Sequence, residues 1–218
     1  MADTPTRLAL LGPHGLDASG VERVAAGLAA ACAAGDVAAV ILRFAPTDER
    51  ALVNLVKRLA PVVQAAEAAL VIACPGFVGD LAAVAARGGA DGVHVERAGE
   101  ADLRDLRSRL RDGRILGAGG VLDSKHEAMA AGENGVDYVL FGGRYPDGVA
   151  PDAEAVRERA AWWAEIFETP CIAVAATADA VAGLVATGAE FVGLDSGLWL
   201  DDAAGVAAAQ RLVPGAAA

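Results

Sequence analysis

The chain has 218 residues, 55% of them hydrophobic and only 5% aromatic, and its formal net charge is −11. This length is typical of one domain, and the apolar fraction is sufficient for a large core. An acidic chain repels the phosphates of nucleic acids, and no basic cluster offsets its charge, so we expect no nucleic-acid partner.

The beginning of the chain and the cysteines indicate the compartment. The segment MADTPTRLALLGPHG has an apolar run too short for a signal peptide, and no uninterrupted apolar stretch reaches the ~18 residues of a membrane span. Cys32, Cys74 and Cys171 are far apart, lie among apolar residues and form no C-x-x-C pair. We therefore predict no membrane partner, free thiols rather than disulfides or a zinc site, and a cytoplasmic protein.

One pattern recurs along the chain: an alanine-rich, helix-like segment ends at a glycine, and a run of β-branched residues follows. The glycines are Gly35, Gly89, Gly135 and Gly188. A glycine directly after a helix favours the left-handed stop, because it lacks a Cβ atom. The apolar runs that follow are too short for helices and predict buried strands. Shorter runs at 7–11, 69–73, 114–117 and 170–175 bring the predicted strands to eight.

Helix-like segments lie between and after these strands. Their predicted ranges are 17–34, 47–67, 78–88, 101–111, 124–134, 152–167, 177–187 and 202–212. Asp17, Thr47, Asp123 and Thr177 each precede an apolar-periodic stretch, and we expect them to cap four of the helices.

Eight strand–helix units with nearly continuous apolar strands predict an α/β fold, a closed (β/α)8 TIM barrel that forms a single domain over residues 1–218. The alternative is a flavodoxin-like or Rossmann sheet, which needs fewer strands. No G-x-G-x-x-G motif opens the first helix, and Pro13 lies where a backbone N–H would be wanted. We expect residues 214–218, rich in alanine, to form a flexible tail.

The reactive groups of such barrels lie at the carboxyl ends of the strands. Arg43 ends an apolar strand, where its charge requires either an anionic ligand or a salt bridge to a neighbouring loop carboxylate. His94 and Glu96 alternate on one strand and therefore point the same way. They are candidates for acid–base chemistry, although a single strand histidine is also typical of a structural role.

Two glycine-rich turns, at 117–120 and 142–144, follow the fifth and sixth predicted strands. Exposed backbone N–H groups in such turns bind phosphate oxygens, and Arg144 adds charge; tight-turn geometry alone is the other explanation of the glycines. Barrels commonly bind phosphate after strands 7 and 8, where this chain offers Ser196. Asp195 precedes it and opposes a phosphate unless its carboxylate turns away.

Trp162, Trp163 and Phe167 form an apolar strip on the sixth predicted helix. Two interpretations are open: packing of the strip against the barrel, or a subunit interface that would make the protein a homo-oligomer.

The blocks GADGVHVE, ILGAGG, NGVDYVLFGGRYPD and PCIAVAATADAVAGLVATGAEFVGLDSGLW resemble, in order and spacing, the superfamily of thiamine phosphate synthase and the TenI-like thiazole tautomerases. The resemblance runs from the second predicted strand to the last. It implies a barrel of thiamine biosynthesis that binds small phosphorylated molecules and Mg²⁺. In the implied reaction a hydroxymethylpyrimidine diphosphate joins a thiazole phosphate and pyrophosphate is released.

Several positions depart from the pattern of that superfamily. Arg43 is kept, but the lysine two residues later is Ala45, and the Asn-Asp pair after the third strand reads Cys74-Pro75. Only a shifted Glu96 or Glu100 would replace the metal carboxylate after the fourth strand. The resemblance thus implies Mg²⁺ while its expected ligands are missing, and we assign no metal-binding residue.

The phosphate contacts are altered as well. The serine after the fifth strand is Gly119, the histidine near it is Val121, and the Gly-Gly pair that holds the thiazole phosphate is Ala175-Ala176. From the resemblance and the strand ends together, the catalytic candidates are Arg43, His94 and Glu96. The candidates for binding ligand or phosphate are Gly119, Gly142, Gly143, Arg144, Ala176 and Ser196.

Three hypotheses follow. The chain is a thiamine phosphate synthase-like transferase with a rearranged site, a non-catalytic binder of a phosphorylated ligand, or a metal-independent, tautomerase-like enzyme that uses His94 and Glu96.

Overall fold

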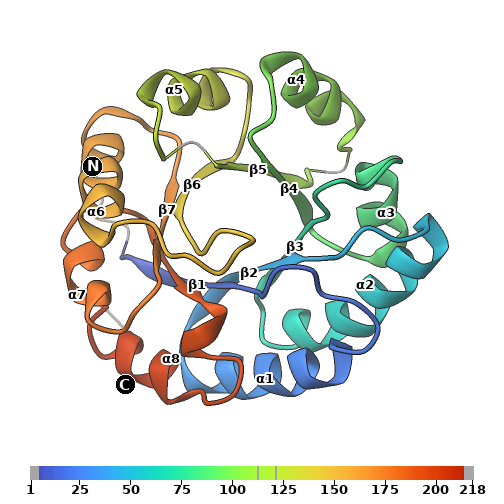
Figure 1. Ribbon diagram of the computed structural model, residues 1–218, viewed down its shortest axis with the longest axis horizontal. Helices are drawn as coiled ribbons and strands as arrows, with labels where there is room; N and C mark the ends of the chain where they lie inside the picture. The colour runs from blue at the N-terminus through green and yellow to red at the C-terminus, as the bar shows by residue number, and fades with distance from the viewer. Residues whose placement is uncertain (1–4, 112, 121, 214–218) are drawn as a thin grey trace.

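A computed structural model describes residues 5–111, 113–120 and 122–213. Eight parallel strands close into a barrel in chain order, and helices surround it (Figure 1). This confirms the predicted TIM barrel and contradicts the open-sheet alternative. The predicted tail at 214–218 and Val121 lie outside the described residues.

The strands are β1 (Arg7–Leu11), β2 (Val37–Arg43), β3 (Ala69–Ala73), β4 (Gly92–Glu96), β5 (Ile115–Gly119), β6 (Tyr138–Gly142), β7 (Cys171–Ala175) and β8 (Phe191–Asp195). The helices are α1 (Val21–Ala34), α2 (Glu49–Gln64), α3 (Leu81–Gly88), α4 (Glu100–Arg109), α5 (Lys125–Glu133), α6 (Ala153–Ile166), α7 (Ala180–Val185) and α8 (Ala204–Gln210), with a 3₁₀ turn at Ser196–Leu198. The barrel closes where β1 pairs with β8, with Leu10 opposite Leu194.

The N-caps of these four helices lie one to three residues after the predicted ones, at Gly20, Asp48, Ser124 and Asp179. Asp17 fails as a cap because its Oδ1 accepts hydrogen bonds from the backbone N–H groups of Ser19 and Gly20, which closes a turn before the helix. Local turn geometry thus competes with helix capping at this side chain.

Three of the four predicted glycine stops are confirmed. Gly89, Gly135 and Gly188 have φ values of 83°, 79° and 82°. Gly35 does not adopt this conformation, because its φ of −168° is extended backbone. A Cβ atom there would lie 2.9 Å from Oε1 of Gln210, so close packing against α8, not a left-handed turn, favours glycine.

Alternation along each strand divides the core into two parts. Inward residues fill the barrel: Ala9, Leu11, Ile41, Val71, Tyr138, Leu140, Ile172 and Val174. Their neighbours on the strands, such as Leu10, Leu42 and Val93, pack beneath the helices. The same period of two directs Arg43, Glu96 and Asp195, each the last residue of its strand, toward the axis at the carboxyl end.

The aromatic strip of α6 packs against the molecule. Trp163 is fully buried, stacks on Phe167 with ring centroids 4.1 Å apart, and donates from Nε1 to the carbonyl of Thr169 at 2.7 Å. The packing interpretation is thus confirmed for Trp163, while Trp162 and Phe167 remain partly accessible. Whether the protein forms a homo-oligomer stays a prediction.

The three cysteines are free, as predicted, and burial raises the pKa of each thiol. Among the described residues, no helix is both long and apolar enough to cross a bilayer.

Candidate functional site

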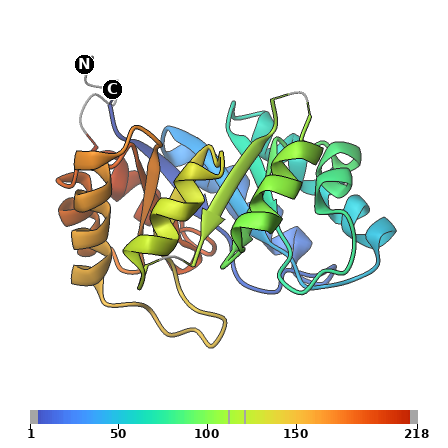
Figure 2. The ribbon, with the colours of Figure 1, turned by 90° about the horizontal axis from the view of Figure 1, so that it is seen from above.

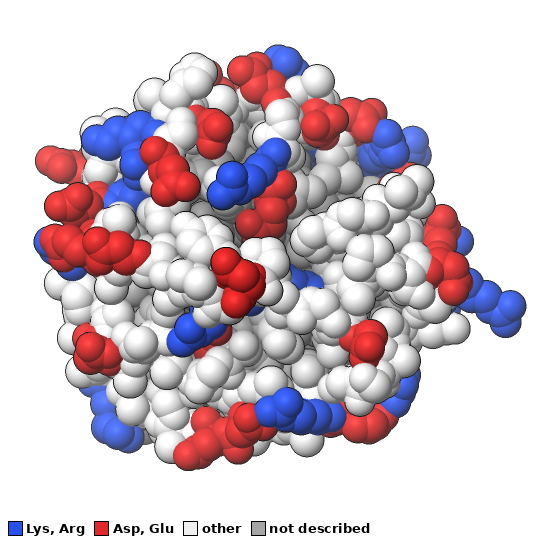
Figure 3. All heavy atoms as spheres, viewed as in Figure 1, with Lys and Arg blue, Asp and Glu red and all other residues white. Residues whose placement is uncertain are grey.

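A cavity of about 310 Å³ lies at the carboxyl end of the barrel, a size that falls at the lower end of small-molecule sites. Residues that end or follow the first six strands line it, and its charged members are Arg43, Glu96, Arg97, Asp123 and Arg144. In Figure 3 this face carries charged side chains mainly around its rim, and single basic and acidic groups lie in its hollowed middle. A protein with a net charge of −11 thus places three arginines at one cavity.

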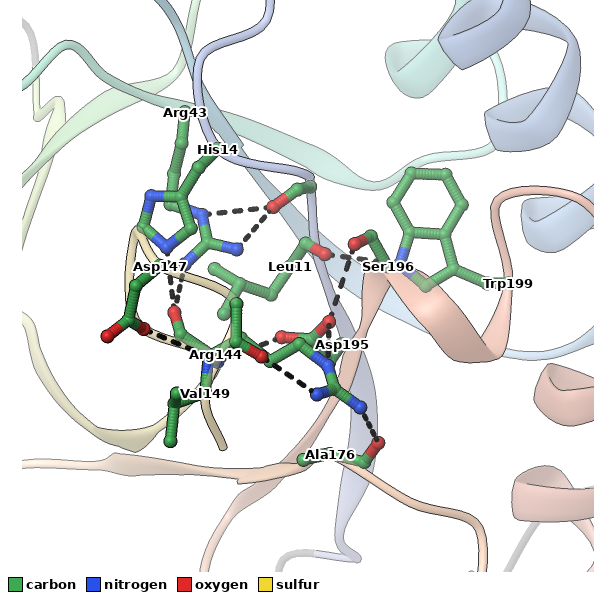
Figure 4. A network of polar contacts seen from close by, with 12 residues as sticks. Leu11, His14, Arg43, Arg144, Asp147, Val149, Ala176, Asp195, Ser196 and Trp199 are labelled. Carbon is green, nitrogen blue, oxygen red and sulfur yellow. Dashed lines mark hydrogen bonds and ion pairs between the residues drawn. The ribbon is translucent and has the colours of Figure 1, made fainter. Parts of the chain in front are cut away.

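Arg43 is only 2% exposed, and its guanidinium is held by carbonyl oxygens. Nε and Nη2 donate to the carbonyl of Gly12 at 2.9 and 2.6 Å, and Nη1 donates to the carbonyl of Arg144 at 3.3 Å (Figure 4). Burial lowers the pKa of Arg43, and the carboxylates of Asp195 and Glu96 oppose this shift. No carboxylate forms a salt bridge with Arg43 among the described residues, so that predicted alternative is wrong.

Arg144 and Asp195 join the loop after β6 to the end of β8. The backbone N–H of Arg144 donates to Oδ2 of Asp195 at 3.0 Å, and Nε of Arg144 lies 3.6 Å from Oδ1. Asp195 is 1% exposed. Asp195 does not line the cavity, and its carboxylate pairs with Arg144, which offsets the negative charge expected to oppose a bound phosphate.

The loop from β6 to α6 folds over the barrel mouth. It crosses the opening in Figure 1 and projects beyond the carboxyl ends of the strands in Figure 2. Within it the N–H of Tyr145 donates to the carbonyl of Val149 at 2.9 Å. Gly142 and Gly143 begin the loop with φ values of 94° and 85°, a conformation in which glycine is favoured, and both line the cavity.

His14 lines the same cavity, although it was not among the predicted site residues. Its Nε2 lies 2.7 Å from the carbonyl of Arg144 and donates to it, since a carbonyl only accepts. The one signal in the sequence is its place just after the first strand, in the turn Gly12–Gly15. The contact with a loop 130 residues later required the closed barrel.

His94 and Glu96 are brought together, as predicted, but His94 lies below the cavity rather than at its surface. Its Nδ1 is 3.0 Å from the phenol oxygen of Tyr138, and its Nε2 is 3.7 Å from Oε1 of Glu96. Burial, followed by the charges of Glu96 and Asp137, raises the pKa of Tyr138, which therefore remains a phenol.

Glu96 is the member of this pair that reaches the cavity, with its side chain 31% exposed. Burial acts to raise the pKa of Glu96, but the interactions with His94, Arg43 and His14 outweigh it, so the pKa lies below its usual value. A carboxylate with a lowered pKa is ionised at neutral pH and is a weak base.

Three predicted binding residues do not line the cavity. Gly119 packs against His94, since a Cβ atom there would lie 2.6 Å from Nε2. The carbonyl of Ala176 accepts from Nη2 of Arg144 at 3.4 Å, and Oγ of Ser196 lies 3.4 Å from Oδ1 of Asp195. The cavity thus draws on the strand ends β1 to β6, and not on the loops after β7 and β8.

The family described as thiamine monophosphate synthase matches residues 14–198. The chain belongs to this family. It is 38% identical over 213 residues to the thiamine-phosphate synthase of Rhodospirillum centenum, which covers 94% of this chain and 95% of that protein. It is 32% identical over 209 residues to the thiamine-phosphate synthase of Erythrobacter litoralis, with 93% of each chain covered. The predicted resemblance is confirmed, and the protein is thiamine phosphate synthase-like.

A solved structure supports the fold. The thiamine phosphate pyrophosphorylase from Pyrococcus furiosus superposes with a TM-score of 0.72 and covers 97% of both chains, at 17% sequence identity. This likeness confirms the eight-stranded barrel.

Membership in the thiamine monophosphate synthase family implies Mg²⁺, yet the side chains at the mouth do not suit this ion. Cys74 is buried, its Sγ lies 3.5 Å from the carbonyl of Ala45, and Pro75 has no side-chain oxygen. Within the described residues, no group of three or more His, Cys, Asp or Glu side chains forms a metal site. Because Mg²⁺ prefers several oxygen ligands in octahedral geometry, the donor set does not fit.

Proposed function

We propose that this protein of the thiamine monophosphate synthase family joins a hydroxymethylpyrimidine diphosphate to a thiazole phosphate at the mouth of the barrel. The observation that carries the proposal is the cavity that Arg43, Arg97 and Arg144 line in an otherwise acidic protein. Guanidinium groups suit phosphate because they offer planar pairs of N–H donors. The curated relatives named thiamine-phosphate synthase, matched over nearly the whole chain, support the same activity.

The proposed reaction forms one bond and breaks one. The ring nitrogen of the thiazole attacks the methylene carbon of the pyrimidine, the bond from this carbon to the diphosphate oxygen breaks, and pyrophosphate leaves with the electron pair. The protein contributes by holding the two ligands in line and by stabilising the negative charge on the leaving group. We assign the phosphate contacts to the backbone N–H groups of Gly142 and Gly143 and to the charges of Arg43 and Arg144.

A second candidate is a non-catalytic binder of a phosphorylated small molecule. The observation in its favour is that Arg43 and Arg144 already donate hydrogen bonds to protein carbonyls. Their positive charges would therefore attract a ligand, while fewer of their N–H groups are left to hydrogen-bond to it. A third candidate, a tautomerase-like enzyme, rests on Glu96 at the cavity with His94 behind it. Glu96 would then be the residue that exchanges a proton with the ligand.

A single-turnover assay separates the synthase from the non-catalytic binder. The protein, in excess over both substrates, is incubated with and without Mg²⁺, and thiamine phosphate is measured after quenching. Product is expected to form, and to disappear in Arg43→Gln while Arg211→Gln, at the opposite end of the barrel, retains it. If no product forms but thiazole phosphate raises the melting temperature, the binder proposal replaces the synthase proposal, since a ligand of the native state stabilises it. If neither occurs, both proposals are wrong.

The cellular compartment of the protein is part of the same proposal. We infer a cytoplasmic protein, because its proposed substrates are charged metabolites and its cysteines are free thiols.

A further inference from the structure

We propose that Arg97 binds a phosphate group of the ligand directly, so that phosphate binding at this barrel mouth does not depend on a divalent cation. The inference deepens the proposed function and rests on it for the identity of the phosphorylated ligand. Three arginines line the cavity. The side chains of Arg43 and Arg144 donate hydrogen bonds to protein carbonyls, and that of Arg97 does not among the described residues.

The backbone at Arg97 is unusual. Its φ of +52° lies in the left-handed region, which residues other than glycine rarely adopt. Its N–H donates to the carbonyl of Gly119 at 3.0 Å, which extends the pairing of β4 with β5 by one residue. The side chain that follows this backbone lies against Gly120 of the next loop, and Arg97 lines the cavity.

The loop after β5 leaves room for this side chain. A Cβ atom on Gly120 would lie 2.6 Å from Cγ of Arg97, and the φ of Gly120 is +72°. Any larger residue at Gly120 would displace Arg97 from its position. The glycine after β5 and the arginine after β4 therefore form one local arrangement, in which Arg97 lines the cavity.

The donors of Arg97 are available to a ligand. Among the described residues, the Arg97 side chain forms neither a hydrogen bond nor an ion pair. Arg43 by contrast donates to Gly12 and to the carbonyl of Arg144, and Arg144 donates to Gly148 and Ala176. Of the three cavity arginines, Arg97 is thus the one whose planar pair of donors is left for a phosphate.

The poor fit of the mouth for Mg²⁺ supports the same conclusion. Cys74 and Pro75 offer no side-chain oxygen ligands, and the two carboxylates at the cavity, Glu96 and Asp123, repel a phosphate unless a cation offsets them. The guanidinium of Arg97 supplies that positive charge from the protein itself. Since its charge is permanent, binding should persist when free divalent ions are removed.

The test is calorimetric titration of the purified full-length protein with inorganic pyrophosphate, in EDTA and in Mg²⁺. We expect comparable dissociation constants in both buffers. Arg97→Gln should weaken binding in EDTA by about ten- to hundredfold, and Arg97→Lys should recover part of the loss because it keeps the charge. Arg211→Gln, exposed after α8 at the other end of the barrel, is the matched control and should bind as the unaltered protein does.

Three results would overturn the inference: no binding of pyrophosphate, loss of binding in EDTA, or an Arg97→Gln variant that binds normally. Circular dichroism and melting temperature check that the variant is folded, which is expected because the Arg97 side chain is exposed. The synthase proposal fails separately. Binding that resists EDTA and depends on Arg97, without formation of thiamine phosphate, would refute that activity and leave this inference intact.

Discussion

The phenol oxygen of Tyr138 lies 3.0 Å from Nδ1 of His94 inside the barrel, and the two rings stack with centroids 5.7 Å apart. The phenol of Tyr138 can donate to or accept from Nδ1, and the other ring nitrogen, Nε2, is the one nearest Glu96. Tyr138 therefore sets the orientation of His94 toward Glu96, although it does not reach the cavity itself.

Tyr138→Phe should lower the free energy of unfolding by about 1–3 kcal/mol, because it leaves the buried Nδ1 of His94 without its partner. Urea denaturation followed by circular dichroism measures the change. Tyr145→Phe, in the loop after β6, is the control and should change stability by less than about 0.5 kcal/mol. Equal stability of the two variants would refute the structural importance of the Tyr138–His94 contact.

Gly117→Ala should destabilise the barrel by about 1–3 kcal/mol, because a Cβ atom there would overlap the ring of Tyr138. The double variant Gly117→Ala/Tyr138→Leu should show a smaller penalty than the sum of the two single changes, since leucine leaves space for the added methyl group. Thermal or urea unfolding of the four proteins completes the cycle. Additive penalties would show that the two side chains do not compete for the same space.

Asp195→Asn should loosen the loop that covers the mouth, because Arg144 would lose the carboxylate facing its N–H and its guanidinium. We expect faster hydrogen exchange of the Arg144 amide and a loss of stability of about 1–3 kcal/mol. Asp36→Asn removes an exposed partner of Arg7, worth at most about 1 kcal/mol, and serves as control. Unchanged exchange at Arg144 would mean that other contacts hold the loop.

Glu96 should make the stability of the protein depend on pH. Its pKa is lowered in the folded state, so its contribution is present above the unfolded pKa of about 4.3 and is lost as the pH falls through the folded value. The stability difference between the unaltered protein and Glu96→Gln should therefore be largest near neutral pH and shrink toward pH ~3. Urea midpoints across this range measure it.

The Glu100→Gln variant controls for the loss of one negative charge at the start of α4. A difference between the unaltered protein and Glu96→Gln that stays constant from neutral to acid pH would contradict the assignment.

The strands were the most predictable part of the fold. Two of them, Arg7–Leu11 and Ala69–Ala73, have the predicted bounds, because short apolar runs between turn residues leave few alternatives. The helix starts were less predictable. Aspartate, serine and threonine residues compete for the same N–H groups, and side chains such as Asp17 satisfy a turn first.

The sequence predicted which strand-end positions form the candidate site. It did not predict which groups the side chains at these positions contact. Arg43 and Glu96 were found as strand-end residues, and His14 and Arg97 were not selected. Gly119, Ala176 and Ser196 were selected as binding residues and do not line the cavity. A side chain at a strand end is directed by the pleat, but what it meets depends on loops far away in the sequence. Arg43 meets the carbonyl of Gly12 instead of a carboxylate for this reason.

The sequence by itself determined the barrel, since repeated strand–helix units and the period of two along each strand are local properties of the chain. It also determined the family, because the blocks of residues that resemble this family can be read from the sequence without the structure. Tertiary structure alone decided which charged side chains interact with other parts of the protein and which are left to face a ligand. Closure of the barrel brings residues up to 188 positions apart into contact, as Leu11 and Trp199 are. No local pattern encodes such pairings.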